Sequence, residues 1–346
     1  MHPIDLRSDT VTLPTNEMLE AISKAELGDD VFQEDPTVNK LEHLAAKTFN
    51  KESAIFMPSG TMANLVAILT HCQRGDEVIL GDQSHTFLYE AGGISSFGGV
   101  HSRQIKNYDD GTMSLEDIKN SIRKKDVHFP PSRLVCLENT HNRCFGMPLD
   151  MNYINKVSEI VKNNSMMLHV DGARIFNAAT ALNKSVAELT SEVDSVSFCL
   201  SKGLSAPSGS LLCGKKEFIE KARFNRKALG GGMRQSGILA AAGIVALNEM
   251  PKKIIKDHQN ASTLAKGLNA ISGISIDLEK VKTNIIYFKL DHSKIDSVTL
   301  INSMLKKNIK FFELGPNWFR LVTHAGINEE DIEHVLIQFK DLFSKI

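Results

Sequence analysis

Short apolar runs alternate with helix-length amphipathic segments from about residue 16 to residue 250. This alternation is typical of β-α-β units and predicts a mostly parallel sheet. Several of the predicted strands are nearly continuous in apolar residues, as buried parallel strands are; they cover 54–57, 77–80, 134–137, 166–170, 195–200 and 210–213. Helical patterning between them predicts helices over 61–72, 115–125 and 152–162.

A second pattern begins where a predicted helix over 236–249 meets Pro251, because proline interrupts a helix and a lysine-rich helical segment follows it. Beyond this junction we expect strands over 284–290 and 318–323, with helices over 297–307 and 329–340. The chain of 346 residues is longer than one hydrophobic core usually supports. We therefore expect a large domain over 1–250, whose N-terminal segment contributes to the active site, and a small α+β domain over 251–346.

Composition and charge narrow the class of protein. The 40 basic and 41 acidic residues give a formal net charge of −1, without the excess positive charge of a nucleic-acid-binding protein. The N-terminus lacks a basic region followed by an apolar stretch, and no apolar segment is long enough to span a bilayer. Five cysteines without a C-x-x-C pair are typical of reduced, mainly buried thiols. We expect a cytoplasmic protein with no nucleic-acid or membrane partner.

Lys202 lies just beyond the predicted strand over 195–200, inside a loop rich in serine, glycine and proline. Such a loop at the end of a strand lets a cofactor approach the backbone. A partly desolvated lysine amine in this place is prepared to form an imine. Taken alone, a lysine after a strand is more often a solvated loop charge.

Asp171 ends the preceding predicted strand and is followed by Gly172, so its carboxylate lies at the same edge of the sheet as Lys202. In enzymes that use pyridoxal 5'-phosphate (PLP), such an aspartate pairs with the pyridine nitrogen and lets the ring accept electrons. The alternative is an aspartate that caps a helix or a turn. Arg174 could bind the phenolic oxygen of the cofactor or a substrate carboxylate, or form a surface ion pair.

Two further features follow strands at this edge. Gly60 and Thr61 begin a predicted helix, where free backbone N–H groups and the helix dipole suit a phosphate, although an ordinary capped helix has the same pattern. The segment matches neither of the glycine-rich dinucleotide or nucleotide motifs. His85 follows the strand over 77–80, and its flat ring could stack on a pyridine ring or remain a hydrogen-bonded loop histidine. Together with Lys202 and Asp171, these features predict a PLP site.

These motifs resemble those of low-specificity L-threonine aldolases, which belong to the aspartate-aminotransferase-like PLP enzymes of fold type I. The resemblance extends through nearly the whole chain and rests on the segments 5–12, 28–32, 58–62, 138–142, 169–174, 200–204 and 230–235. Departures are modest: Ala63 stands where glycine is common, Ser205 and Ser208 vary the lysine loop, and residues 143–146 are bulkier. They bear on substrate preference more than on the reaction.

The resemblance implies a role for each candidate residue. Those that would hold the cofactor are Lys202 as the Schiff-base lysine, Asp171 at the pyridine nitrogen, His85 stacked on the ring, and Gly60 and Thr61 at the phosphate. Those that would bind the substrate carboxylate are Ser8, Arg174 and Arg320, with His141 near the β-hydroxyl. Lys227 and Arg234 would lie in a loop that reaches the active site of a neighbouring subunit, in a homotetramer of two catalytic dimers. These two residues and Arg174 would also contact the cofactor.

The implied reaction is PLP-dependent retro-aldol cleavage of L-threonine or L-allo-threonine to glycine and acetaldehyde, with other β-hydroxy-α-amino acids as further substrates. The base stays open between His141, His85 and a bound water. A β-eliminating lyase or aminotransferase is the nearest alternative, disfavoured by the segments 8–10 and 138–142, and a non-catalytic PLP-binding or assembly protein is another. We expect no catalytic metal, because no local cluster of His, Cys, Asp or Glu has metal-ligand spacing.

Overall fold

The computed structural model describes residues 3–345 and is organised around a seven-stranded sheet of order β2-β8-β7-β6-β5-β3-β4. The strands are β2 (Ser53–Met57), β3 (Glu77–Gly81), β4 (His101–Ile105), β5 (Ser132–Glu138), β6 (Met167–Asp171), β7 (Ser195–Cys199) and β8 (Ser210–Gly214). Pairing is parallel from β4 through β7, and β8 runs antiparallel to both of its neighbours. The predicted mostly parallel α/β sheet is confirmed.

Two details of this domain differ from the sequence prediction. Strand β4 was not predicted, because most of its residues are polar and at least partly exposed at the edge of the sheet. The helix predicted over 115–125 was too long: α6 (Leu115–Ser121) ends where Ile122 adopts an extended backbone conformation with ψ 122°. The next N–H group, that of Arg123, donates to Ser132 Oγ at 3.0 Å instead of continuing the helix.

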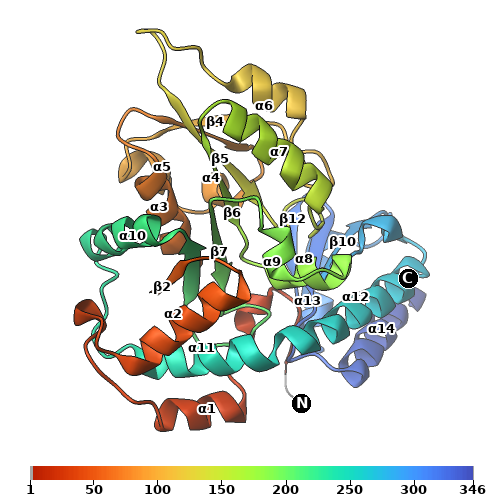
Figure 1. Cartoon of the computed structure of the whole chain (residues 1–346). Helices are drawn as coiled ribbons and strands as arrows, with labels where there is room; N and C mark the ends of the chain where they lie inside the picture. Colours follow the sequence, from red (N-terminus) through yellow and green to blue (C-terminus); the bar gives the residue numbers. More distant parts are fainter. Residues whose placement is uncertain (1–2, 346) are drawn as a thin grey trace.

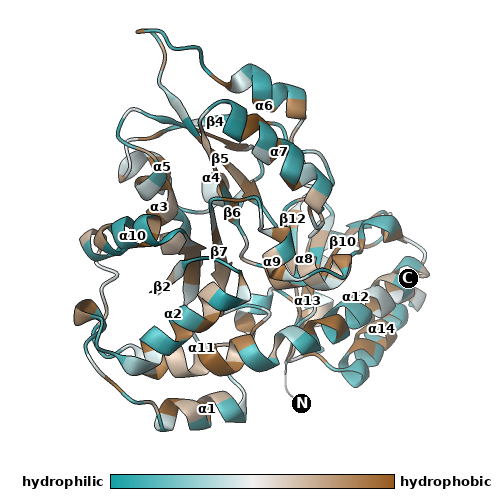
Figure 2. Cartoon of the chain, in the orientation of Figure 1, coloured by the Kyte–Doolittle hydropathy of each residue, from teal (hydrophilic) through white to brown (hydrophobic). Residues whose placement is uncertain are grey.

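Helices cover both faces of the sheet (Figures 1 and 2). One face packs against α3 (Gly60–His71), α5 (Gly93–Ser96) and α10 (Lys216–Ala228). The other packs against a larger apolar cluster that includes α2 (Pro36–Thr48), α7 (Met151–Asn163), α8 (Ile175–Leu182), α9 (Val186–Leu189) and α11 (Gly237–Glu249), and α1 (Asn16–Ser23) lies on α11. Burial of the sheet on both faces explains why its strands are continuous in apolar residues.

The C-terminal region has its own apolar cluster and an antiparallel sheet of order β12-β13-β10-β9. Its elements are α12 (Ile254–Asn269), β9 (Ile274–Ser275), β10 (Ile285–Leu290), α13 (Ser297–Leu305), β11 (Ile309–Lys310), β12 (Phe312–Gly315), β13 (Trp318–Val322) and α14 (Glu329–Ser344). The N-terminal strand β1 (Ile4–Asp5) pairs in parallel with β11, and Ile4 and Leu6 are buried in this second cluster. The N-terminal segment is therefore anchored on the small domain before it reaches the central sheet.

No helix within residues 3–345 is long and apolar enough to cross a membrane. Residues 1, 2 and 346, which belong to the two expected domains, lie outside the described part of the chain.

Candidate active site

A cleft of about 300 Å³ lies between the carboxyl edge of the central sheet, the N-terminal segment and the small domain. Its walls are formed by Ser8, Thr10, His85, Tyr89, Asn142, Arg143, Arg174, Lys202, Phe312, Leu314 and Arg320. Five of the residues predicted from the sequence are among them: Ser8, His85, Arg174, Lys202 and Arg320. The fold thus brings together side chains more than 300 positions apart in the sequence.

Asp171 is the last residue of β6, and Lys202 lies in the loop after the neighbouring parallel strand β7. The carbonyl of Lys202 accepts a hydrogen bond from Thr12 Oγ1 at 3.1 Å. Its amine has no hydrogen-bond or ion-pair partner among residues 3–345. The Asp171 carboxylate is held on both oxygens, since Oδ1 accepts from the N–H of Ala173 at 3.0 Å and Oδ2 accepts from Asn64 Nδ2 at 2.8 Å. A free amine therefore lies at the same sheet edge as a fixed carboxylate.

Helix α3 begins beside the same edge. Ser59 caps it through a hydrogen bond from the N–H of Met62 to Ser59 Oγ at 3.2 Å. In the described part of the chain, the N–H groups of Gly60 and Thr61 have no acceptor. A Cβ atom on Gly60 would lie 2.8 Å from Cys199 Sγ, so glycine lets the helix start pack on the end of β7 without displacing that side chain. The helix therefore begins with free N–H groups, which suit an anion, although neither residue lines the cleft itself.

His85 is held from two directions. Its backbone N–H donates to Glu138 Oε2 at 2.7 Å, and its ring Nδ1 lies 2.9 Å from Glu90 Oε1. Burial alone would lower the pKa of His85, but the hydrogen bond with Glu90 and the negative charges of Asp171 and Glu90 raise it above its usual value. Burial raises the pKa of Glu90. With Nδ1 bonded to Glu90, Nε2 is the ring nitrogen left for the cleft.

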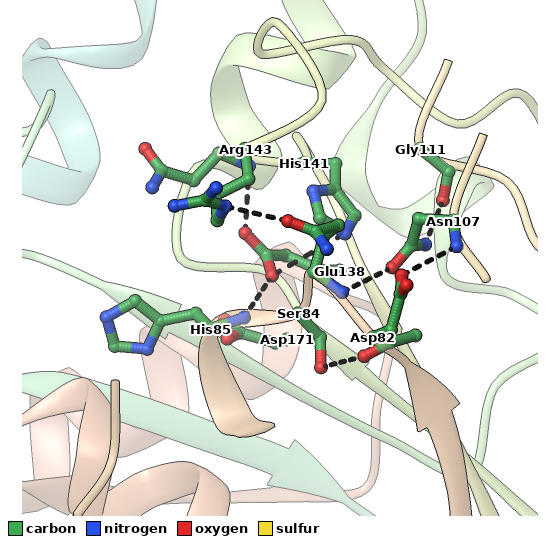
Figure 3. A network of polar contacts seen from close by, with 12 residues as sticks. Asp82, Ser84, His85, Asn107, Gly111, Glu138, His141, Arg143 and Asp171 are labelled. Carbon is green, nitrogen blue, oxygen red and sulfur yellow. Dashed lines mark hydrogen bonds and ion pairs between the residues drawn. The ribbon is translucent and has the colours of Figure 1, made fainter. Parts of the chain in front are cut away.

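Glu138 connects the start of the short helix α4 (His85–Leu88) with the turn that carries Asn142. Figure 3 shows its contact with His85. One carboxylate oxygen accepts from the His85 backbone, and the other accepts from the N–H of Asn142 at 2.8 Å. Asn142 Oδ1 in turn accepts from Arg320 Nη1 at 2.9 Å. One buried carboxylate thus fixes two walls of the cleft relative to each other.

Arg174 is already paired in the structure. Its Nε and Nη2 groups donate to the two carboxylate oxygens of Asp9 at 2.7 and 2.6 Å. Burial would raise the pKa of Asp9, but the charge and hydrogen bonds of Arg174 lower it to about 2. This bidentate pair is buried on both sides. Arg174 therefore lines the cleft with its charge neutralised by Asp9.

Arg320 has no such carboxylate. Its Nη1 donates to Asn142 Oδ1 and its Nη2 donates to the carbonyl of Arg7 at 3.0 Å, both of which are neutral acceptors. Its Nε is buried and has no partner among the described residues. Burial and the neighbouring Arg174 lower the pKa of Arg320. Since a buried charge is costly unless it is paired, this guanidinium marks a place for an anion.

Besides Gly60 and Thr61, four predicted residues do not line the cleft, namely Asp171, described above, and His141, Arg234 and Lys227. His141 is only 1% exposed, and its Nε2 lies 3.9 Å from Glu138 Oε2 (Figure 3). Arg234 forms an ion pair with Asp29 at 2.8 Å, and Lys227 lies in the last turn of α10. None of these last three lines the cleft of its own chain.

Only one set of potential metal ligands occurs in residues 3–345, namely His85, Glu90 and Asp171, whose ligand atoms lie within 4.8 Å of one another. The His85–Glu90 hydrogen bond and the amide of Asn64, which donates to both carboxylates at 2.8 Å, already connect these groups. The absence of a catalytic metal stays a prediction.

Several residues that shape the site were not predicted from the sequence, namely Asn64, Tyr89, Glu90, Asn142 and Arg143. Arg143 lines the cleft and is held by neutral partners, Gln83 Oε1 at 2.9 Å and the hydroxyl of Tyr89 at 2.6 Å. One signal was present for Asn64, which is a polar residue inside the otherwise apolar segment 62–69. The other residues lie in loops or short helices, where polar side chains are ordinary.

A free lysine amine, a fixed aspartate behind it, an open helix N-terminus and a histidine ring at one sheet edge fit the amine, pyridine and phosphate chemistry of PLP. The fold is that of the PLP-dependent enzymes of fold type I, and these residues are compatible with a PLP-dependent lyase.

The sequence comparisons place the chain within this class. A sequence model described as Beta-eliminating lyase matches residues 5–291. The chain belongs to this family, within the branch of the low-specificity L-threonine aldolases. It is 47% identical over 344 residues to low-specificity L-threonine aldolase 1 of Arabidopsis thaliana, covering 98% of this chain and 96% of that protein. It is 42% identical over 342 residues to low specificity L-threonine aldolase of Escherichia coli strain K12, covering 99% and 100%.

A solved structure of Leishmania major threonine aldolase has the same fold, with a TM-score of 0.84, 18% identity, and 99% and 100% of the two chains covered. The family's description names β-elimination, which is the alternative reaction that the sequence left open. The relatives compared above are nevertheless named as aldolases.

Asp9→Asn tests the buried ion pair. It would leave the Arg174 guanidinium buried without a counter-charge, so we expect the free energy of unfolding to fall by about 3–5 kcal/mol in chemical denaturation. The matched control is Asp291→Asn, which breaks the exposed Lys289–Asp291 pair of 2.6 Å and should change stability far less. Equal losses in the two variants would contradict the importance assigned to Asp9.

Proposed function

We propose that this protein binds PLP and catalyses retro-aldol cleavage of L-threonine and L-allo-threonine to glycine and acetaldehyde, and that it accepts other β-hydroxy-α-amino acids. The observation that carries the proposal is the cleft that joins the unpaired Lys202 amine, the His85 ring and the unpaired Arg320 guanidinium. The aldolase names of the relatives support the same reaction.

The bound cofactor would supply an electron sink for the electron pair released at the substrate's α-carbon. Lys202 would hold it covalently, and Asp171 would accept a hydrogen bond from its ring nitrogen. The N–H groups of Gly60 and Thr61 would bind its phosphate. These roles agree with the positions of the four residues at the ends of β6 and β7 and at the start of α3.

Arg320 would bind the substrate carboxylate, together with the hydroxyl of Ser8. Arg174 would mainly help to position the substrate, because its Nε and Nη2 groups already donate hydrogen bonds to Asp9. A carboxylate fixed in this way orients the bond between the α and β carbons, and cleavage is favoured when that bond stands perpendicular to the cofactor ring.

His85 is the better-supported base for the β-hydroxyl proton. It lines the cleft, and its contact with Glu90 leaves Nε2 available to accept a proton. His141 is buried away from the cleft, so its proposed role beside the β-hydroxyl has less geometric support.

We further propose a cytoplasmic homotetramer built from two catalytic dimers, with Lys227 and Arg234 reaching the active site of a neighbouring subunit. Their position outside the cleft of their own chain agrees with this arrangement. No nucleic-acid partner and no catalytic metal are proposed.

Purified protein loaded with PLP should convert L-threonine to equal amounts of acetaldehyde and glycine. Lys202→Ala should abolish turnover with an unchanged melting temperature, and borohydride should fix the cofactor to Lys202 in the parent protein, as located by mass spectrometry. The control Lys215→Ala removes another lysine that follows a strand and should retain full activity. Formation of an α-keto acid or ammonia without acetaldehyde would rule out the aldolase reaction.

The role of Glu90 can be tested through the pH profile. If neutral His85 is the base, kcat/KM should rise with pH around a midpoint above the ordinary histidine value of about 6.5. Glu90→Gln removes a negative charge that raises the pKa of His85, so the midpoint should move to lower pH by about one unit. The exposed control Glu20→Gln should leave the profile unchanged. A midpoint that stays in place in Glu90→Gln would exclude His85 as the titrating base.

A further inference from the structure

Polar side chains gather behind Asp171, between α3 and the strands β6 and β7. Asn64 and His71 are seven positions apart on α3, which places them on one side of the helix. Successive outward positions of a strand are two residues apart, and the register pairs His169 with Ser195 and Asp171 with Ser197. The sequence therefore directs all of these side chains into the same helix–sheet interface, which is otherwise apolar.

The groups are connected by an unbroken series of hydrogen bonds. His71 Nε2 lies 2.8 Å from Ser195 Oγ, and that hydroxyl lies 2.9 Å from His169 Nδ1. His169 Nε2 lies 3.3 Å from Asn64 Oδ1. Asn64 Nδ2 reaches Asp171 Oδ2 and Glu90 Oε1, both at 2.8 Å.

The carboxylates of Asp171 and Glu90 can only accept hydrogen bonds, and this determines which atom is the donor at each step of the series. Asn64 faces two carboxylates, so its NH₂ group must point toward them and its Oδ1 must accept from behind. Oδ1 accepts from Ser197 Oγ at 2.7 Å, and His169 can satisfy its own contact only by donating from Nε2. His169 Nδ1 is then an acceptor for the Ser195 hydroxyl.

The Ser195 oxygen, having donated its proton to His169, must accept one from His71 Nε2. Burial keeps both imidazoles neutral near pH 7, because it lowers the pKa of His71 to about 3 and that of His169 to about 4. Every donor along the series therefore points toward Asp171.

We propose that His71, Ser195, His169 and Asn64 form a one-way hydrogen-bond relay that fixes the Asp171 carboxylate as the acceptor for the cofactor's ring nitrogen. The four are positioning residues, and the inference rests on the role proposed for Asp171 above. With Asn64 donating to Oδ2 and the Ala173 N–H donating to Oδ1, each carboxylate oxygen has a fixed donor and the carboxylate is held in one orientation. Such a carboxylate favours a protonated ring nitrogen, the state in which the ring accepts electrons best.

The energetics favour this function over simple packing. Ser195 and His169 are fully buried, and buried polar groups cost free energy unless each one is satisfied. Apolar residues of similar size could fill the same interface without that requirement. His71, at the far end of the relay, is half-buried and stacks on Phe218 with ring centroids 4.3 Å apart.

Ser195→Ala tests the relay by removing only its middle hydroxyl. The matched control is Ser158→Ala, which removes an equally buried hydroxyl that donates to the carbonyl of Glu192 at 2.8 Å outside the relay. In Ser195→Ala we expect weaker PLP binding to the apoprotein, an altered visible spectrum of the bound cofactor, and a lower kcat with little change in KM. Loss of one hydrogen bond corresponds to a change of about 3- to 10-fold in the dissociation constant and in kcat. Ser158→Ala should match the parent protein in all four measurements.

His71→Phe is a second test at the far end, since it keeps the ring on Phe218 and removes the Nε2 donor. It should change the cofactor spectrum and the PLP affinity in the same direction as Ser195→Ala. If Ser195→Ala does not fold, His71→Phe provides the test of the relay. The relay is refuted if the folded variants match Ser158→Ala in PLP affinity, visible spectrum and kcat, whatever their melting temperatures.

The measurements of PLP affinity and of the spectrum need no substrate. A parent protein that binds PLP but releases no acetaldehyde would therefore contradict the proposed reaction and leave the relay to be judged by those two measurements.

Discussion

The buried ion pair between Asp9 and Arg174 is the constraint on which the site depends. Asp9 belongs to an N-terminal segment whose first strand pairs with β11 of the small domain, whereas Arg174 follows the end of β6 in the central sheet. Asn284, from the small domain, also approaches Asp9, with 3.4 Å between its Nδ2 and Asp9 Oδ2. One carboxylate therefore connects the N-terminal segment, the sheet edge and the C-terminal region around the cleft.

This pairing also decides how positive charge is distributed in the cleft. Because Asp9 neutralises Arg174, Arg320 remains the buried guanidinium without a carboxylate, and Asn142 holds it in position. On the opposite side of the site, Asn64 holds Asp171 from behind. The unpaired guanidinium of Arg320 thus lies toward the small domain, and the fixed carboxylate of Asp171 lies toward the sheet, which suits the proposed binding of an amino acid and PLP between them.

Much of this arrangement could be predicted from the sequence, because it follows from local rules. Parallel strands end at one edge, so Asp171 at the end of β6 and Lys202 after β7 were expected to converge. The helix start at Gly60 and the position of His85 shortly after β3 follow from the same reasoning. Edge strand β4 was missed, since its polar residues resemble a loop.

Contacts between distant positions could not be predicted in this way. Asp9 and Arg174 are 165 positions apart, and nothing local distinguishes an arginine that binds a substrate from one that binds an aspartate. Similarly, Glu90 has a role only because the fold places it beside His85 and Asn64. A weaker signal was present in the relay, where His169, Ser195 and Ser197 interrupt apolar strands. Polar residues in such strands identify a buried network but not its partners.

The most direct test of this account is the affinity of the PLP-loaded protein for glycine, which carries the substrate carboxylate without a β-hydroxyl. Arg320→Leu should raise the glycine dissociation constant by about 10- to 100-fold, the effect of losing hydrogen bonds to a charged group. Arg143→Leu removes another cation from the same cleft, one held by neutral partners, and should have a much smaller effect. Unchanged glycine affinity in a folded Arg320→Leu variant would contradict the assignment of Arg320 as the carboxylate anchor.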